Sequence, residues 1–226
     1  MKAVIRTPEE AAERARGEGK KNQTIRKKRN EMASIRSRNP RSRRDDTKLK
    51  EAILYLSTLT ERDRYCGAVK LNKLLFYADF IAYRRLGKSI TGQEYQHLPQ
   101  GPCPRGMKPA LEELERRDEI ATREEPMFGG AYRQKRTFAK RLADLSKFSG
   151  PEVDLFHEVV ERFWDNNATD ISDLSHEFIG WQLTEINETI PYSTVLIATR
   201  KPTTREIKIG QHLRKFAQEA LSRNSR

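Results

Sequence analysis

Apolar residues recur at helical spacing in several parts of the chain, and the densest pattern lies between Ala68 and Leu86. One face of this stretch and a second stripe beside it together carry nine apolar residues: Leu71, Leu74, Leu75, Ala78, Ala82, Val69, Phe76, Phe80 and Tyr83. Its polar positions form too narrow a strip for a helix lying on a surface. We therefore expect this helix to be buried at the centre of the domain.

Sparser patterns of the same period predict helices around the central one. Their apolar positions are Leu49, Ala52, Ile53 and Leu56; Met107, Leu111 and Leu114; Val153, Phe156, Val160, Phe163 and Trp164; and Ile209, Leu213, Phe216 and Ala220. A further helix is expected over Asp170 to Trp181. Ser149 to Glu152 has the form of a capping box, and Thr203 with Glu206 can cap the last helix.

Short strands are predicted in two places. One runs from about Glu94 to His97 and ends in a rigid turn rich in Gly and Pro, and two more, Ile120 to Arg123 and Tyr132 to Phe138, form a hairpin across Gly129-Gly130. The helix near Met107 followed by this hairpin is like a winged helix in its order of elements. The expected fold class is α+β, mainly α, with a central buried helix, surrounding helices and a small β-hairpin.

Charge divides the chain into an arm and a domain. The formal net charge is +12, yet residues 1–45 hold 15 Lys/Arg and 6 Asp/Glu, which leaves 29 and 26 for the other 181 residues, a net of only +3. Residues 1–44 have the composition of a disordered basic arm, because apolar residues are too few to build a core. The folded domain is expected over residues 45–226.

Chemistry of the usual enzyme kinds is not indicated. The sequence contains no GxxxxGK[ST], GxGxxG or GxSxG, and His176-Glu177 is followed by Gly180 where a zinc-protease helix needs its second histidine. Cys66 and Cys103 are the only cysteines, and no apolar run reaches 18 residues. We expect a cytoplasmic protein with free thiols, without a cofactor, a bound metal or a membrane span, and not an enzyme.

Three blocks in order carry a family resemblance. They are Lys-Leu-Asn-Lys-Leu-Leu-Phe-Tyr-Ala-Asp at Lys70–Asp79, Ile-Thr-Gly with Tyr95 five residues after Ile90, and Gly101-Pro102, with Ser175-His176 and Trp181 as a weaker fourth. This pattern resembles the SocA-like Panacea domain family. The resemblance implies a bacterial or phage antitoxin of a toxin-antitoxin pair, which neutralises a protein toxin by direct binding and can also act as an adaptor that hands the toxin to a Clp-type protease.

The residues of a partner-binding surface are expected around the Gly-Pro turn. A rigid turn presents a preorganised surface and so lowers the entropic cost of binding. The candidate residues are Tyr95, His97, Gln100, Gly101, Pro102, His176 and Trp181. For the turn, for His176 and for Trp181 a structural role remains open beside the functional one.

A nucleic-acid-binding regulator is the alternative function. Clustered cations neutralise phosphates without reading the base sequence. Its candidate residues lie in the arm and on the second hairpin strand: Arg26, Lys27, Lys28, Arg29, Arg41, Arg43, Arg44, Arg133, Lys135 and Arg136. The helix near Met107 carries four carboxylates close by, which repel a phosphate backbone.

Overall fold

The computed structural model describes residues 44–127, 130, 132–197, 203, 204 and 209. The chain divides into two units, residues 1–195 and 196–226, and the architecture below is that of the first. Its elements are α2 (Asp46–Leu59), α3 (Ala68–Leu86), β1 (Tyr95–Gln96), β2 (Cys103–Pro104), α4 (Met107–Arg116), β3 (Ile120–Met127), β4 (Tyr132–Ala139), η2 (Leu145–Lys147), α5 (Gly150–Arg162), α6 (Ala168–His176), α7 (Ile179–Gln182), β5 (Thr189–Ile190) and η3 (Tyr192–Leu196). The predicted class, α+β and mainly α, is confirmed.

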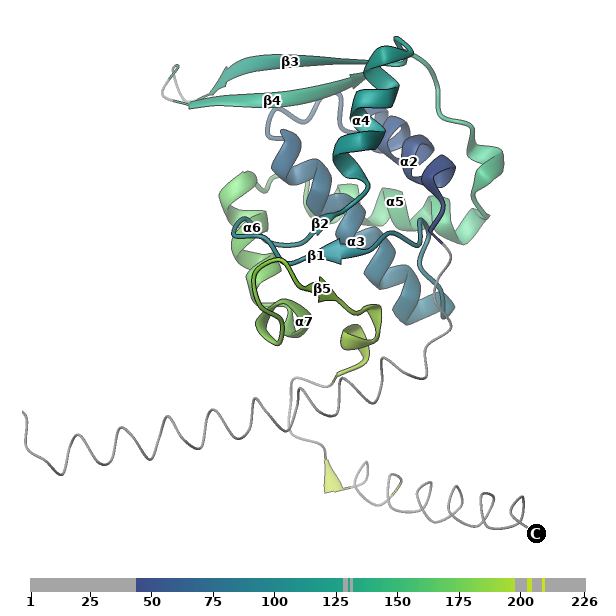
Figure 1. Ribbon diagram of the computed structural model, residues 1–226, viewed down its shortest axis with the longest axis vertical. Coiled ribbons are helices and arrows are strands. Elements are labelled where there is room, and N and C mark those ends of the chain that lie inside the picture. Colours follow the sequence, from purple (N-terminus) through teal and green to yellow (C-terminus); the bar gives the residue numbers. More distant parts are fainter. Residues whose placement is uncertain (1–43, 128–129, 131, 198–202, 205–208, 210–226) are drawn as a thin grey trace, which may run out of the picture. The chain divides into compact units, whose positions relative to one another are not determined.

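Helix α3 is the centre of the domain, as predicted. Its apolar face packs against α2, α5 and α6, and ten of its nineteen residues are buried. Figure 1 shows the other elements arranged around it. The helix ends at Gly87, whose φ of 75° is a conformation that glycine adopts without strain. Because both sides of α3 are covered, even its lysines and its aspartate lie inside the protein.

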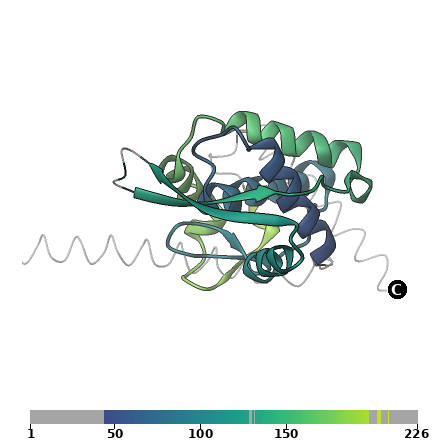
Figure 2. The ribbon, with the colours of Figure 1, turned by 90° about the horizontal axis from the view of Figure 1, so that it is seen from above.

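The predicted hairpin is confirmed, with a first strand four residues longer than expected. Strands β3 and β4 pair antiparallel from Ile120 opposite Ala139 to Met127 opposite Tyr132. The extension includes Pro126, which a strand without a further neighbour tolerates. Seen from above, the hairpin crosses the body with α5 on one side and α4 on the other (Figure 2). Helix α4 and the hairpin form the winged-helix-like element.

The second sheet is small but joins distant parts of the chain. Strand β1 lies between β2 and β5, with Tyr95 opposite both Pro104 and Ile190. The strand predicted at Glu94 to His97 is thus present but limited to Tyr95–Gln96. The Gly101-Pro102 turn leads from β1 to β2 in this sheet.

One helix prediction is wrong. The chain from Asp170 to Trp181 is not a single helix, because α6 ends at His176 and α7 begins at Ile179. Phe178 has extended backbone angles (φ −64°, ψ 124°) and places its ring against Phe76 and Phe80. Burial of this aromatic side chain outweighs the continuation of the helix. The Ser149 capping box is confirmed, whereas the arm at residues 1–43 and most of the helix predicted after Thr203 lie outside the described residues.

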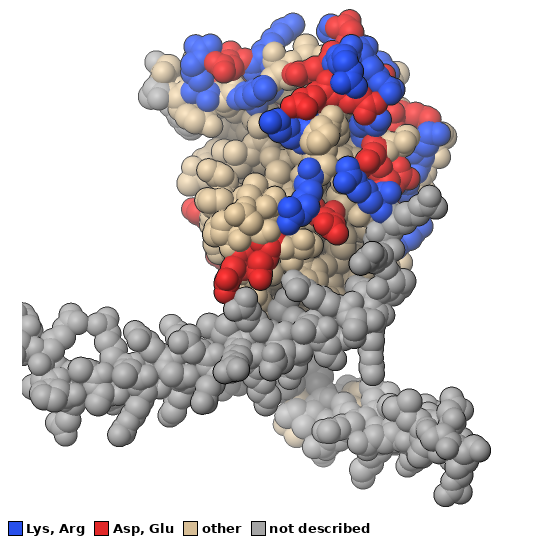
Figure 3. Space-filling view, viewed as in Figure 1, with Lys and Arg blue, Asp and Glu red and all other residues tan. Residues whose placement is uncertain are grey.

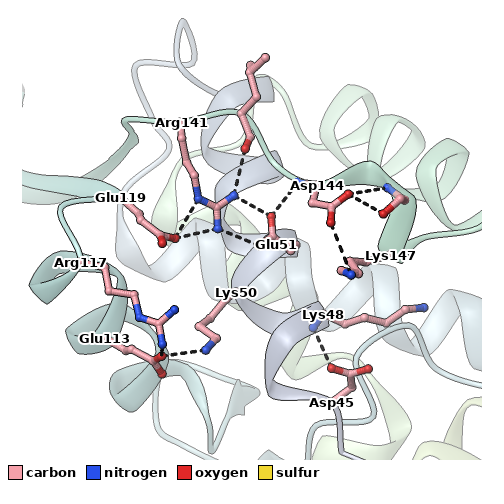
Figure 4. A network of polar contacts seen from close by, with 12 residues as sticks. Asp45, Lys48, Lys50, Glu51, Glu113, Arg117, Glu119, Arg141, Asp144 and Lys147 are labelled. Atoms are coloured by element: carbon pink, nitrogen blue, oxygen red, sulfur yellow. Dashed lines mark hydrogen bonds and ion pairs between the residues drawn. The ribbon is translucent and has the colours of Figure 1, made fainter.

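An ionic network joins the elements on the hairpin side of the domain (Figure 4). Arg141 donates to both carboxylate oxygens of Glu51 on α2, at 2.9 and 2.7 Å, and to Glu119 at 2.9 and 2.7 Å. The guanidinium lowers the pKa of the Glu51 carboxyl below its ordinary value. Nearby, Glu113 on α4 pairs with Lys50 and Arg117. Charged residues of this region therefore bind one another.

Candidate partner-binding site

The Gly101-Pro102 turn closes over α3 and α6. The Lys73 ammonium donates to the Pro102 carbonyl at 3.2 Å. Gly101 has a φ of 93°, and a β-carbon there would lie 2.2 Å from Ser175 Oγ and 2.8 Å from Lys73 Cε. Only glycine fits such a position, since both the backbone angle and the space exclude a side chain. Three of the four sequence blocks thus meet at this turn.

The Ile90–Thr91 segment and Tyr95 are held by the fully buried carboxylate of Asp79. It accepts hydrogen bonds from the backbone N–H groups of Ile90 and Thr91, both at 2.8 Å, from the Thr91 hydroxyl at 2.5 Å and from the Tyr95 hydroxyl at 2.8 Å. Burial raises the pKa of this carboxyl, although the four donors act in the opposite direction. The last residue of the first block therefore anchors the whole second block.

Trp181 lies between two imidazole rings. Its ring is stacked on His97 with centroids 4.1 Å apart and on His176 with centroids 4.2 Å apart. The indole N–H donates to the carbonyl of Leu98 at 3.3 Å, and His97 Nδ1 lies 3.1 Å from the Thr184 hydroxyl. Burial lowers the pKa of His97. This three-ring stack fixes the loop that leads from β1 to the Gly-Pro turn.

A pocket of about 390 Å³ lies between the hairpin, that loop and α6. Twelve of the described residues line it: Tyr65 and Val69 before and on α3, Pro99 and Gln100 in the loop, Met127, Tyr132 and Gln134 on the hairpin, and Asn167, Ala168, Thr169, Ser172 and His176 at α6. None of them is Asp, Glu, Lys or Arg. The site therefore offers apolar surface with a few hydrogen-bonding groups, which is the usual character of a recognition pocket.

The candidate residues from the sequence separate into two groups. Gln100 and His176 line the pocket, and Trp181 stacks directly behind His176. The other four, Tyr95, His97, Gly101 and Pro102, are buried. In this structure the four buried residues hold the loop in place, whereas Gln100 and His176 contribute to the wall of the pocket.

Of the four cations of the nucleic-acid alternative that the structure describes, three form ion pairs within the domain. Arg136 is 8% exposed, pairs with Glu125 at 3.0 Å and donates to the carbonyl of Glu61 at 2.9 Å. Arg133 pairs with Glu124, and Lys135 lies opposite the same glutamate across the hairpin. Arg44 pairs with Asp46. The remaining candidates in residues 26–43 lie outside the described part of the chain.

Two lysines in the first block were missed as structural determinants. Lys70 is 1% exposed, pairs with Asp63 at 2.6 Å and donates to the carbonyls of Trp164 and Asn166, both at 2.8 Å. Lys73 is 2% exposed, and burial lowers its pKa to about 8. The sequence did contain a signal for their burial, which is their position on a helix that is apolar on both sides. Such a helix leaves a lysine side chain no path to solvent.

Other kinds of site are not found in the part of the chain that the structure describes. No group of three or more His, Cys, Asp or Glu side chains there is arranged to hold a metal ion. None of the helices within the described ranges has the length and apolar character needed to cross a membrane. Burial raises the pKa of Cys66 to about 11, which keeps its thiol protonated and unreactive.

Comparison with known proteins assigns the family. Residues 71–182 match the model of the family described as antitoxin SocA-like, Panacea domain. No curated protein and no solved structure matches the chain significantly. The matched segment runs from the first turn of α3 to the end of α7 and includes the Asp79 anchor, the Gly-Pro turn and the three-ring stack. Residues 71–182, just under half of the chain, therefore place this part of the protein in the antitoxin SocA-like Panacea domain family.

Proposed function

We propose that this protein is an antitoxin that neutralises a protein toxin by direct protein–protein contact. Membership of the antitoxin SocA-like family is the observation that carries the proposal. The contact surface is the loop Leu98–Gln100 together with the pocket-facing side of α6. Inhibition is steric and stoichiometric, without turnover of a substrate.

The geometry of the site supports this surface. Leu98 and Gln100 are tied to the core through the indole of Trp181 and the Ser172 hydroxyl, which donates to the Gln100 carbonyl at 3.2 Å. A loop held in this way loses little conformational freedom when a partner binds. The pocket beside it supplies the concave, uncharged surface in which interface residues with large binding contributions are found.

The test is coexpression with the protein encoded by the neighbouring open reading frame. That protein alone should arrest growth, and coexpression should restore growth with the two proteins copurifying in a fixed ratio. Absence of growth arrest, or rescue without copurification, would contradict direct neutralisation. The lifetime of the toxin then separates two mechanisms, because simple blocking leaves it unchanged and delivery to a Clp-type protease shortens it.

Nucleic-acid binding is the second candidate function, favoured by the net charge of +9 in residues 1–45. It predicts duplex DNA binding whose affinity falls steeply with salt concentration. Replacing Arg26, Lys27, Lys28 and Arg29 with Glu should then abolish binding, while the same exchange at Arg133 and Lys135 on the hairpin should have a smaller effect. Rescue of growth by the arm variant would show that the arm is not needed for neutralisation.

A further inference from the structure

One continuous part of this basic protein carries acidic charge alone. Residues 163–190, which contain α6, α7 and β5, include Asp165, Asp170, Asp173, Glu177, Glu185 and Glu188 and not a single Lys or Arg. The whole chain has a net charge of +12. Figure 3 shows one face, where blue and red side chains are mixed over the hairpin and α4, while the surface directly below the hairpin is mostly uncharged and has red side chains at its lower edge.

The acidic residues of α6 lie beside the pocket. Thr169, Ser172 and His176 line it at spacings of three and four residues, so they share one side of the helix. Asp173 and Glu177 follow Ser172 and His176 by one position each and form the adjoining stripe, and both are exposed. No described Lys or Arg forms an ion pair with either of them.

The pocket itself suits one large apolar side chain. Its volume of about 390 Å³ is near the lower end of the range for sites that enclose a small molecule. None of its described lining residues is Lys or Arg, so a phosphate or a carboxylate group would find hydrogen-bond donors there but no permanent positive charge. Met127 contributes a flexible and polarisable thioether at the hairpin side, which adapts to aromatic or branched side chains.

We infer that the pocket binds a single aromatic or long aliphatic side chain of a protein partner, and that Lys or Arg residues flanking this anchor meet Asp173 and Glu177. This inference deepens the proposed function, because the partner is the toxin. The apolar anchor supplies most of the binding energy, since it is removed from water in a preformed pocket. The carboxylates set the orientation and accelerate the encounter, as charges at the rim of an interface do.

The test uses the full chain and short peptides as probes. The peptide acetyl-Lys-Arg-Phe-Lys-Arg-amide should bind and shift the NMR signal of the Trp181 indole N–H. The peptide with Ala in place of Phe, and the acidic peptide acetyl-Glu-Asp-Phe-Glu-Asp-amide, should each bind at least about tenfold more weakly. Equal binding of either control peptide would overturn the inference.

Variants of the protein locate the site. Thr169→Trp fills the pocket from an exposed position of α6 and should weaken binding of the basic peptide at least about tenfold. Glu161→Trp, at an exposed position of α5, is its control and should bind like the native chain. Asp173→Asn with Glu177→Gln should remove most of the salt dependence of binding, whereas Asp154→Asn on α5 should not. Unchanged binding in Thr169→Trp would overturn the inference.

The same variants separate this inference from the antitoxin proposal. If the native chain binds the toxin and Thr169→Trp binds it equally well, the antitoxin function stands and the anchor site is wrong. If the basic peptide binds but the toxin does not, the site stands and the antitoxin function is wrong. If replacing Arg26, Lys27, Lys28 and Arg29 with Glu strengthens peptide binding, the basic arm of this chain is the natural occupant, which would contradict a separate partner.

Discussion

Two regions of the domain differ in how their charged side chains are paired. One is the hairpin side, which comprises the hairpin, α2, α4 and the segment around Arg141, and the other is the α6 side, which comprises α6 and the pocket. On the hairpin side, carboxylates and guanidinium groups satisfy each other, as Arg141 does with Glu51 and Glu119. On the α6 side, Asp173 and Glu177 face solvent beside an uncharged pocket. Charges that are paired internally stabilise the fold, whereas exposed charges of one sign next to an apolar hollow are available to a partner. The difference teaches that the net charge of +12 says little about the local charge beside the pocket.

The largest loss of stability should come from Gly101→Ala, which disturbs the α6 side at the contact between the Gly-Pro turn and Ser175. The new methyl group would overlap Ser175 Oγ and Lys73 Cε at a backbone angle that disfavours any side chain. We expect a loss of about 4 kcal/mol in the free energy of unfolding, measured by urea denaturation. Gly87→Ala is the control, because it has a similar φ of 75° but open space around it, and should cost only about 1 kcal/mol. Equal losses would show that crowding at the turn has no effect.

The two buried lysines of α3 sharpen the comparison between paired and unpaired charge. Lys70→Met leaves the buried Asp63 without its cation and should cost about 3 kcal/mol. Lys73→Met removes an ammonium group that donates to the Pro102 carbonyl at 3.2 Å and pairs with no carboxylate of the described residues, so it should be neutral or stabilising. Thermal unfolding of both variants at pH 7 measures this difference. A larger loss in Lys73→Met would contradict it.

The pH dependence of stability reports on Lys73 directly. Burial lowers its pKa to about 8 in the folded protein, whereas an unfolded chain holds this proton to a higher pH. Above pH 8 the unfolded state therefore binds more protons, and stability from this group rises with pH. Between pH 7.5 and 9.5 the native chain should gain about 1 to 2 kcal/mol relative to Lys73→Met. A constant difference between the two proteins would contradict the depressed pKa.

The smallest effect is expected on the hairpin side. Arg141→Ala removes a partly exposed guanidinium that joins Glu51 to Glu119, and should cost about 1 kcal/mol after allowance for solvent screening. Arg133→Ala breaks an exposed pair with Glu124 and should give no measurable change. Neither variant should alter binding of the basic peptide. A loss of peptide binding in either one would place part of the recognition surface on the hairpin side.

The sequence predicted the parts of this fold that depend on periodic burial. The central helix, the hairpin and the Ser149 cap follow from local patterns that the tertiary structure does not override. The break between α6 and α7 was missed because it depends on Phe178 reaching Phe76 and Phe80, which lie about a hundred residues earlier in the chain. No local signal records such a contact.

The candidate site was predictable only in part. The family pattern selected His176, which lines the pocket, but also Tyr95 and Gly101, which are buried, and Gln100 was selected as a neighbour of the Gly-Pro turn. A sequence motif records which residues a structure requires. It does not distinguish buried residues that hold a loop in place from accessible residues that can contact a partner. The hairpin residues Met127, Tyr132 and Gln134 were missed, because they reach the pocket only through the folding of the hairpin over α6.

Hydrogen–deuterium exchange of the protein with and without its toxin tests the central claim most directly. The account predicts slower exchange in the complex for the amides of Leu98–Gln100 and of α6, with no change in the segment around Arg141. Protection confined to the hairpin and α4, with α6 unaffected, would contradict it.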